Sequence, residues 1–290
     1  MTKRNKMVLV AVSVLLVLLL PLVGACQGSS QTGDQNNQEQ TELSGTITES
    51  GSTSVKPLVE EMAAAFMQKH PKVQIEIGGG GSGKGVSDCA ADISDIGAAS
   101  RPVKLSEQDM IPYPIARDAV AIVVNEANPI DELTMKQVAQ IYVGEISNWA
   151  DLGWAEGGEI SVYCREKGSG TLDCFVSNLI KAVGYEEDQI IDEAERVDSN
   201  AGMQAGAQGD ESGIGFVSLG YVQGLQVIKL DGIEATMENC ASGEYPVLRR
   251  LRLLTKTCPD EPIKSFIDFC RSDEGQQIAE ELGYVPLNID

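Results

Sequence analysis

The sequence predicts an α/β fold, and three observations indicate it. Strand-like runs alternate with amphipathic, helix-like runs from Ser44 onward. Loops rich in glycine and serine separate several of these strands from the helices that follow. The chain has 290 residues, of which 42% are hydrophobic, and this is enough for one large domain or two modest ones.

Periodicity defines the individual elements. Residues 72–77 alternate with period two, which predicts a strand, whereas 119–125 form a nearly continuous apolar run, which predicts a buried strand. Apolar residues recur with helical spacing over 55–69, and Thr134 is a typical N-cap. In chain order we expect strands at 45–48, 72–77, 92–98, 119–125, 160–163, 213–217 and 251–254, and helices at 55–69, 134–141, 172–182 and 262–282.

The N-terminal segment has the features of a targeting sequence. Three cations within the first six residues precede an apolar run that is too short for a comfortable membrane span. The run Val23-Gly24-Ala25-Cys26 resembles the lipobox of bacterial lipoproteins, in which cleavage occurs before the cysteine and its thiol carries a diacylglycerol, with palmitate among the expected acyl chains. We therefore expect a signal peptide at 1–25, a lipidated Cys26, a flexible tether at 26–44 and a location on the outer face of the cell membrane. An ordinary secretory signal is the alternative.

Composition excludes several classes of function. The formal net charge is −21, so a basic surface for nucleic acid is not expected. His70 is the single histidine, which leaves no material for histidine-dependent catalysis or for a histidine metal site. A Walker-like run ends in Gly83-Lys84, but Gly85 stands where Ser or Thr would bind Mg²⁺. We expect a protein that is not an enzyme and has no catalytic residues, metal or cofactor.

Six cysteines follow Cys26. An even number outside the cytoplasm permits disulfides, but six buried free thiols would give the same pattern. The sequence leaves both alternatives open for Cys89, Cys164, Cys174, Cys240, Cys258 and Cys270.

Three loops predict an anion-binding site. They span 51–54, 81–84 and 165–171, and each lies where a strand ends and a helix begins. Such a point offers unpaired backbone N–H groups and the positive end of the helix dipole. Glycines permit close approach of the backbone, hydroxyls add donors, and the planar guanidinium of Arg165 can engage two oxyanion oxygens at once. One such loop is often only a capped turn, but three together favour a bound oxyanion.

The order of these motifs resembles that of the phosphate-binding proteins of ABC phosphate importers. The similar segments are 48–54, 79–85, 95–101, 144–149 and 165–171. The resemblance implies a two-lobed periplasmic-binding-protein fold of type II, with the ligand cleft between the lobes. It further implies that lobe I comprises 45–116 plus 248–290 and that lobe II comprises 117–247.

The resemblance also implies a function and a set of ligand contacts. The expected protein is a lipid-anchored monomer outside the cytoplasm that binds inorganic phosphate and delivers it to an ABC permease and its ATPase. The phosphate-binding residues carried over by the motifs are Ser52, Thr53, Ser54, Ser82, Arg165, Ser169, Gly170 and Thr171.

One position departs from the family pattern. Many members have Gly-Ala-Ser-Asp, and that aspartate accepts the proton of HPO₄²⁻, but Ser100 followed by Arg101 stands at this place here. Arg101 is either a further cationic contact or a structural arginine, and Asp118 is either a substitute acceptor or a hinge or cap residue. Receptors for sulfate, molybdate or tungstate therefore remain an alternative, and a surface enzyme or adhesin on the same scaffold is a weaker one.

Overall fold

The structure is a computed structural model that describes residues 42–287. The predicted signal peptide, the predicted lipidation site Cys26 and most of the predicted tether lie outside the described residues. The strands are β1 (Gly45–Gly51), β2 (Val73–Ile77), β3 (Ile96–Ala99), β4 (Ile111–Val124), β5 (Glu132–Leu133), β6 (Ser161–Arg165), β7 (Glu195–Val197), β8 (Gly213–Ser218), β9 (Gln226–Leu230) and β10 (Leu248–Thr255). The helices are α1 (Lys56–Lys69), α2 (Ser82–Ala90), α3 (Met135–Tyr142), α4 (Gly170–Phe175), α5 (Asn200–Gly209), α6 (Met237–Ser242), α7 (Ile263–Arg271) and α8 (Asp273–Glu281).

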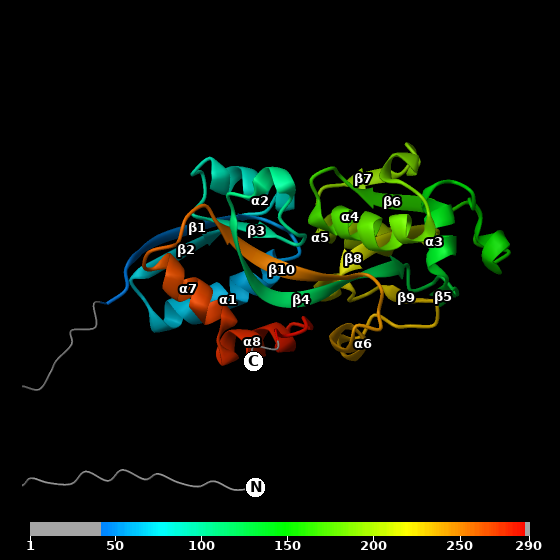
Figure 1. Ribbon diagram of the computed structural model, residues 1–290. Coiled ribbons are helices and arrows are strands. Elements are labelled where there is room, and N and C mark those ends of the chain that lie inside the picture. The colour runs from blue at the N-terminus through cyan, green and yellow to red at the C-terminus, as the bar shows by residue number, and fades with distance from the viewer. Residues whose placement is uncertain (1–41, 288–290) are drawn as a thin grey trace, which may run out of the picture. The chain divides into compact units, whose positions relative to one another are not determined.

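The strands form one mixed sheet in the order β2-β1-β3-β10-β4-β8-β6-β7, with β9 paired to both β4 and β5. Strands β1, β2 and β3 are parallel and are connected through α1 and α2. The long strands β4 and β10 pair antiparallel through the middle of the sheet, with a bulge between Leu251 and Arg252 (Figure 1). These two strands link the two ends of the sheet.

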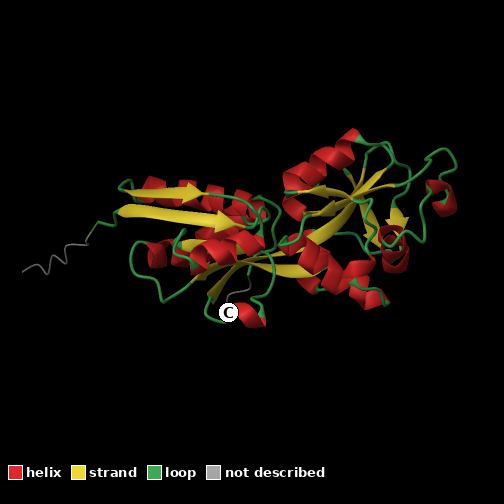
Figure 2. Cartoon of the chain, turned by 90° about the horizontal axis from the view of Figure 1, so that it is seen from above, coloured by secondary structure: helices red, strands yellow, loops and turns green. Residues whose placement is uncertain are grey.

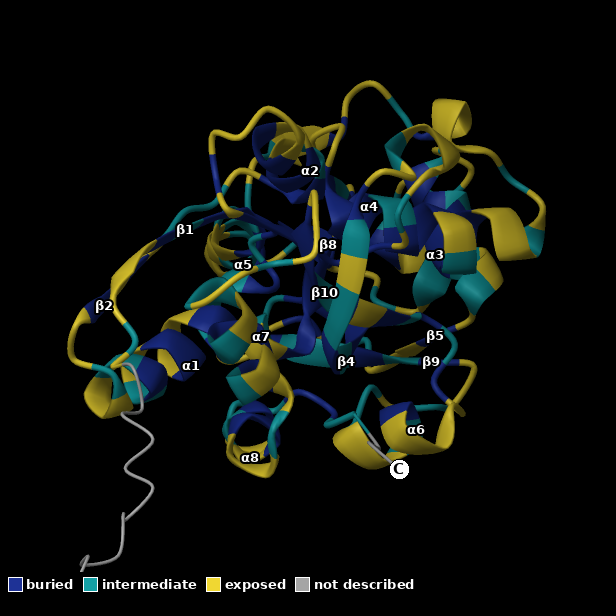
Figure 3. Ribbon diagram, turned by 60° about the vertical axis from the view of Figure 1, so that its left-hand side comes forward, coloured by how far each residue is buried: buried dark blue, intermediate teal, exposed yellow. Residues whose placement is uncertain are grey.

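Two large hydrophobic clusters lie on either side of this central pair. One gathers α1, α7 and the inner residues of β1 and β2, and the other gathers α3, α4, β6 and β8. Helices lie around the strands in both parts of the fold (Figure 2). Strand β4 contributes to both, since Ile115 and Ala116 pack in the first cluster and Ala119 onward in the second. Strand β8 is buried along its whole length, whereas most helices keep one exposed face (Figure 3).

Most expected elements are present, but several have other bounds, and α2, α5, α6, β7 and β9 were not among the expected elements. The strand expected at 119–125 begins eight residues earlier, at Ile111. The expected helix 172–182 begins two residues earlier, at Gly170, and after Phe175 continues as a wider turn and then a 3₁₀ turn. The strand expected at 92–98 begins only at Ile96. The expected helix 262–282 is broken at Ser272, whose hydroxyl accepts a hydrogen bond from Gly275 N (3.3 Å) and so caps a second helix.

Within residues 42–287 the six cysteines are free thiols, and all but Cys258 are buried. Burial raises the pKa of the Cys174 and Cys240 thiols to about 12, so these groups behave as small apolar core residues. None of the helices in this part of the chain is long and apolar enough to cross a membrane.

Candidate functional site

The N-terminal ends of four helices lie together at the middle of the sheet. Ser54, in the loop before α1, lies 3.1 Å from Thr171 of α4 between hydroxyl oxygens, and its hydroxyl accepts a hydrogen bond from Asn200 Nδ2 of α5 (2.8 Å). At the start of α2, Gly83 N donates to Gly168 O in the loop before α4 (2.9 Å). Since each helix begins with unpaired N–H groups and a partial positive charge, the arrangement is electrostatically suited to an anion.

Gly170 allows α4 to approach α2 closely. A Cβ atom at this position would lie 2.2 Å from Ser82 Oγ and 2.5 Å from Ser100 Oγ. These two hydroxyls already lie 3.3 Å apart, and Ser82 Oγ accepts a hydrogen bond from Ser100 N (3.0 Å). A glycine is therefore required for the backbone of α4 to meet the two serines.

Arg165 lies at the end of β6 and is 1% exposed. Its Nε donates to Val197 O (3.2 Å) and its Nη2 to Asp198 O (2.7 Å), so backbone carbonyls fix the plane of the guanidinium. Its Nη1 is buried and has no hydrogen-bond partner in the part of the chain that the structure describes. Burial first, and then the positive charge of Arg249, lower the pKa of Arg165 to about 10. The group stays protonated at neutral pH, and one buried donor is left for a ligand.

Arg249, on β10, is a second buried cation, and it belongs to none of the sequence motifs described above. Its Nε donates to Asp118 Oδ2 (2.8 Å), its Nη1 to Thr171 Oγ1 (2.9 Å) and its Nη2 to Ser54 Oγ (2.8 Å). It therefore joins the hydroxyls that begin α1 and α4. Asp118 compensates the charge of Arg249, whereas Arg165 has no carboxylate partner within residues 42–287. A buried cation of this kind is costly unless an anion compensates for it.

Comparisons with known proteins agree with this geometry. A family model described as the PBP superfamily domain matches residues 36–274. A curated relative named phosphate-binding protein PstS, from Staphylococcus aureus, is 30% identical over 289 residues, with 91% of this chain and 84% of the relative covered. A protein of the same name from Bacillus subtilis is 26% identical, with 98% of this chain and 95% of the relative covered.

Solved structures give the same result. An ABC-transporter substrate-binding protein from Clostridium perfringens, solved with bound phosphate, superposes with a TM-score of 0.80 at 36% identity and covers 84% of this chain and 100% of its own. An ABC-type phosphate transport receptor from Vibrio cholerae superposes with a TM-score of 0.67 at 32% identity, with 83% and 100% covered. This chain belongs to the phosphate-binding protein family. The expected α/β architecture of the two-lobed, type II periplasmic-binding-protein fold is thereby confirmed.

Several hydroxyl groups predicted from the family motifs lie in the region of the four helix ends. Thr53 Oγ1 accepts a hydrogen bond from Asn200 Nδ2 (3.1 Å), and Ser54 and Thr171 contact Arg249 as described above. Ser169 caps α4 by accepting from Leu172 N (3.3 Å). The structure thus brings Thr53, Ser54, Ser82, Arg165, Ser169, Gly170 and Thr171 to the ends of neighbouring elements.

Ser52 differs from the expectation. Its backbone N donates to Ala98 O of β3 (3.0 Å), so this N–H is already paired within the fold. Its hydroxyl accepts from Ser54 N (3.3 Å), so Ser52 shapes the turn that precedes α1.

Arg101 and Asp118 are both committed to other protein groups. Arg101 forms ion pairs with Glu107 (Nη1 to Oε2, 2.7 Å) and with Asp173 of α4 (Nε to Oδ2, 2.9 Å), which favours its structural interpretation. The carboxylate of Asp118 is fully buried and accepts hydrogen bonds from Ser218 Oγ (2.8 Å), from the backbone N of residue 219 (3.2 Å) and from Arg249. Its contacts make Asp118 the residue that positions Arg249, in place of the substitute acceptor considered above.

Two residues of the site were missed by the sequence analysis. Asn200 begins α5, and its amide also connects the site to the sheet, since Ser218 N donates to Asn200 Oδ1 (3.1 Å). Arg249 occupies an inward position of β10, where arginine is unusual unless it is paired. That conflict between residue type and buried position was the signal that could have identified it.

Proposed function

We propose that this chain is a receptor outside the cytoplasm that binds one inorganic phosphate ion between its two lobes and delivers it to an ABC import permease and its ATPase. The phosphate names of its relatives and the bound phosphate in the Clostridium perfringens structure support the choice of ligand. In this proposal the protein binds one ligand at a time and does not turn it over.

One observation carries the proposal. Arg165 and Arg249 are buried close to the N-terminal ends of four helices, and Arg165 Nη1 has no partner in residues 42–287. A tetrahedral oxyanion would compensate the charge of Arg165, since Asp118 already compensates Arg249, and would accept hydrogen bonds from the nearby hydroxyl and N–H groups. Charge-assisted hydrogen bonds contribute about 1.5–3 kcal/mol each, so a few of them are sufficient for tight binding after the cost of dehydration.

The same proposal assigns the lobes. Lobe I would comprise residues 45–116 plus 248–290, and lobe II residues 117–247, with hinge motion on β4 and β10. The two separate hydrophobic clusters and the passage of β4 between them support this division. Hydrogen bonds such as Gly83 N to Gly168 O and Arg249 to Thr171 would then connect the lobes in the closed, ligand-bound arrangement.

Attachment to the membrane is a separate part of the proposal. It rests on the cationic start, the apolar run and the lipobox-like Cys26, and acyl chains on that cysteine would hold the protein through their buried CH₂ groups. A Cys26→Ala variant should be released from membranes into the soluble fraction. Membrane attachment that persists in this variant would reject the anchor without affecting the proposed ligand.

Sulfate and related oxyanions are the competing ligands. Two observations keep them in competition: Ser100 stands where many family members have an aspartate, and Asp118 is paired with Arg249. A free carboxylate in the site would reject sulfate, because sulfate carries no proton to donate and the oxygens of the two groups would face each other unpaired. If phosphate is preferred, a hydroxyl or backbone carbonyl must accept its proton.

Titration calorimetry of phosphate-free protein separates these ligands. We expect one-to-one binding of phosphate at pH 6 and at pH 8, with sulfate silent at equal ionic strength. Tight sulfate binding would replace phosphate in the proposal, and binding of neither ion would reject the receptor function. Steady release of phosphate from a phosphoester would favour an enzyme on this scaffold.

A further inference from the structure

A large cavity beside the site is lined by an unusual number of cations. Its volume is about 1100 Å³, and it lies between the loop 100–106, the strand pair β4/β10 and the helical segment that begins with α4. Five of the nine arginines in the sequence and two of its thirteen lysines line it, whereas its acidic lining residues are Asp173 and Glu187. In a chain of net charge −21 this local excess of positive charge indicates a site for an anion.

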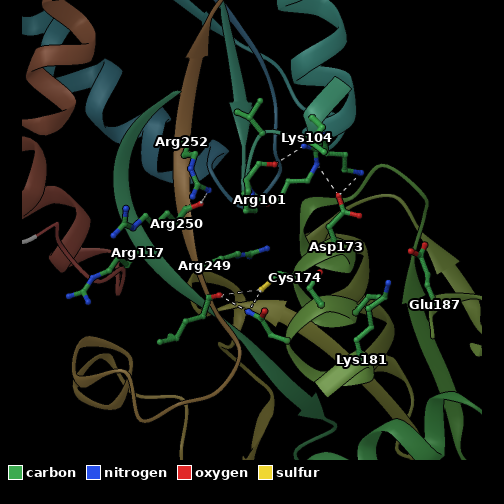
Figure 4. Close-up of a pocket in the computed structure, with 18 of the residues that line it drawn as sticks. Arg101, Lys104, Arg117, Asp173, Cys174, Lys181, Glu187, Arg249, Arg250 and Arg252 are labelled. Carbon is green, nitrogen blue, oxygen red and sulfur yellow. Dashed lines mark hydrogen bonds and ion pairs between the residues drawn. The ribbon is translucent and has the colours of Figure 1, made fainter. Parts of the chain in front are cut away.

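Three of these arginines are without a carboxylate partner. Arg117 of β4 and Arg250 of β10 are directly opposite in the antiparallel pairing (Figure 4), and Arg252 lies two residues further along β10. None of the three forms an ion pair with any residue between 42 and 287. The structure pairs Arg101 with two carboxylates and Arg249 with Asp118, so the lack of partners is specific to this trio.

The contacts of the trio leave donors free. Arg117 donates from Nη1 to Ala241 O (3.2 Å), and its buried Nε has no partner in the described part of the chain. Arg252 donates from Nη1 to Arg250 O (2.8 Å), and burial, followed by the charge of Arg250, lowers the pKa of Arg252. Like charges placed directly opposite on paired strands destabilise the pairing unless a bound counter-charge relieves them.

The cavity is distinct from the site of the four helix ends. Arg249 and Ser100 line it at its boundary with that site, but the lining does not include Ser54, Arg165 or Asn200. Arg249 and Arg250 point to opposite sides of β10, as the alternation of a strand requires (Figure 4). A ligand can therefore occupy the cavity while the site at the four helix ends, called the first site below, is filled.

We propose that this cavity binds a small polyanion that carries two or more phosphate or carboxylate groups, with Arg117, Arg250 and Arg252 as its cationic contacts. The planar guanidinium fork suits either type of oxyanion. The volume exceeds what a single phosphate ion fills and lies slightly above the range of about 300–1,000 Å³ for small-molecule sites. Because β4 and β10 connect the two hydrophobic clusters, such a ligand would contact the segment on which lobe movement depends.

The test uses the full chain, kept in solution with a non-ionic detergent and saturated with inorganic phosphate so that the first site is filled. Tripolyphosphate and citrate are titrated separately by calorimetry, with sulfate at equal ionic strength as the control for screening. We expect one-to-one binding of at least one of the two polyanions and no saturable binding of sulfate. Comparison of the two polyanions tells whether phosphate or carboxylate groups are preferred.

A double variant, Arg250→Gln with Arg252→Gln, should weaken polyanion binding at least about tenfold, since it removes two charge-assisted contacts. The matched control, Lys136→Gln with Arg271→Gln, removes two exposed cations elsewhere and should leave binding unchanged. If the double variant does not fold, Arg250→Gln alone is measured in its place, because it changes only an exposed side chain.

Three results would overturn the proposal. The first is that neither polyanion shows saturable binding. The second is that polyanion binding weakens equally in the double variant and in its control. The third is that the double variant also loses phosphate binding, which would mean that the cavity and the first site are one site. If phosphate is not the ligand of the first site, that site stays empty during the titration, and a polyanion could bind there. Weakening of polyanion binding in the Arg250 and Arg252 variant, but not in its control, would still assign the polyanion to the cavity, so the two failures are distinguishable.

Discussion

Arg249 and Arg250 are neighbours on β10 with opposite surroundings. Arg249 is buried, is paired with Asp118 and holds hydroxyls that begin two helices. Arg250 is exposed, lies opposite Arg117 and has no carboxylate partner within residues 42–287. The difference shows that one strand provides a fixed hydrogen-bond donor on one side and an unpaired positive charge on the other. Burial with a partner gives rigidity, and exposure without one gives a charge that a ligand can neutralise.

The largest expected effect is on stability. Arg249→Met leaves Asp118 buried without its cation, which should lower the free energy of unfolding by about 3–5 kcal/mol. Arg250→Met, its matched control, should change that free energy by less than about 0.5 kcal/mol. Denaturant unfolding measures both. Equal effects of the two substitutions would remove the distinction between the two sides of β10.

A double variant tests whether the loss of stability comes from the unpaired charge of Asp118. Asp118→Asn combined with Arg249→Met removes both charges of the pair and should recover part of the lost stability, because no uncompensated charge remains buried. A double variant that is as unstable as the sum of its single variants would mean that Arg249 stabilises the fold through packing alone.

A buried carboxyl group without a partner extends the comparison. Glu49 of β1 is buried, its two carboxyl oxygens have no hydrogen-bond partner among the described residues, and burial raises its pKa to about 8 from the ordinary 4.5. The folded chain therefore holds a proton that the unfolded chain releases between these values. The free energy of unfolding should fall by a few kcal/mol as the pH rises from about 4.5 to 8.

Glu49→Gln should flatten this part of the pH profile, and Glu76→Gln, which changes an exposed carboxylate of β2, should leave it as in the wild type. Unfolding curves at pH 5 and pH 8 are sufficient. An unchanged slope in Glu49→Gln would show that another group titrates in this window.

Loss of the unpaired Arg165 donor in the first site should reduce phosphate affinity more than it reduces the stability of the fold. Arg165→Gln removes the Nη1 group that awaits a ligand, and we expect about 10-fold to 100-fold weaker phosphate binding, which corresponds to one or two charge-assisted hydrogen bonds. Lys167→Gln removes an exposed cation from the same loop and should bind as the wild type does. Calorimetric titration compares them, and wild-type affinity in Arg165→Gln would reject the role assigned to this arginine.

The smallest expected effect concerns the close approach of α4 to α2. In Gly170→Ala the added methyl would meet Ser82 Oγ and Ser100 Oγ, and overpacking of this kind costs about 1–3 kcal/mol. We expect roughly tenfold weaker phosphate binding from calorimetric titration. Gly209→Ala, which has open space around its Cβ position, should keep wild-type affinity.

The sequence predicted the parts of the site that are built locally. A strand followed by glycine, serine and a helix is a pattern of neighbouring residues, so the loops at 51–54, 81–84 and 165–171 could be found without the fold. The break at Ser272 was not predicted, because the residues on both sides of it have helical periodicity. The close approach of Gly275 to the end of the preceding helix depends on how the two helices pack, which periodicity does not show.

The missing residues are those whose meaning depends on distant contacts. Arg249 lies 131 positions from Asp118 and 195 from Ser54, and no local pattern connects them. Asn200 likewise contacts Thr53 across 147 positions. Arg101 was recognised as a candidate, but only the fold shows that Glu107 and Asp173 occupy its guanidinium.

A crystal structure of the protein with its bound oxyanion would test the proposed phosphate site directly. We expect phosphate at the N-terminal ends of α1, α2, α4 and α5, with one of its oxygens about 2.7–2.9 Å from Arg165 Nη1. Phosphate bound elsewhere, or Arg165 Nη1 still without a partner in the complex, would contradict it.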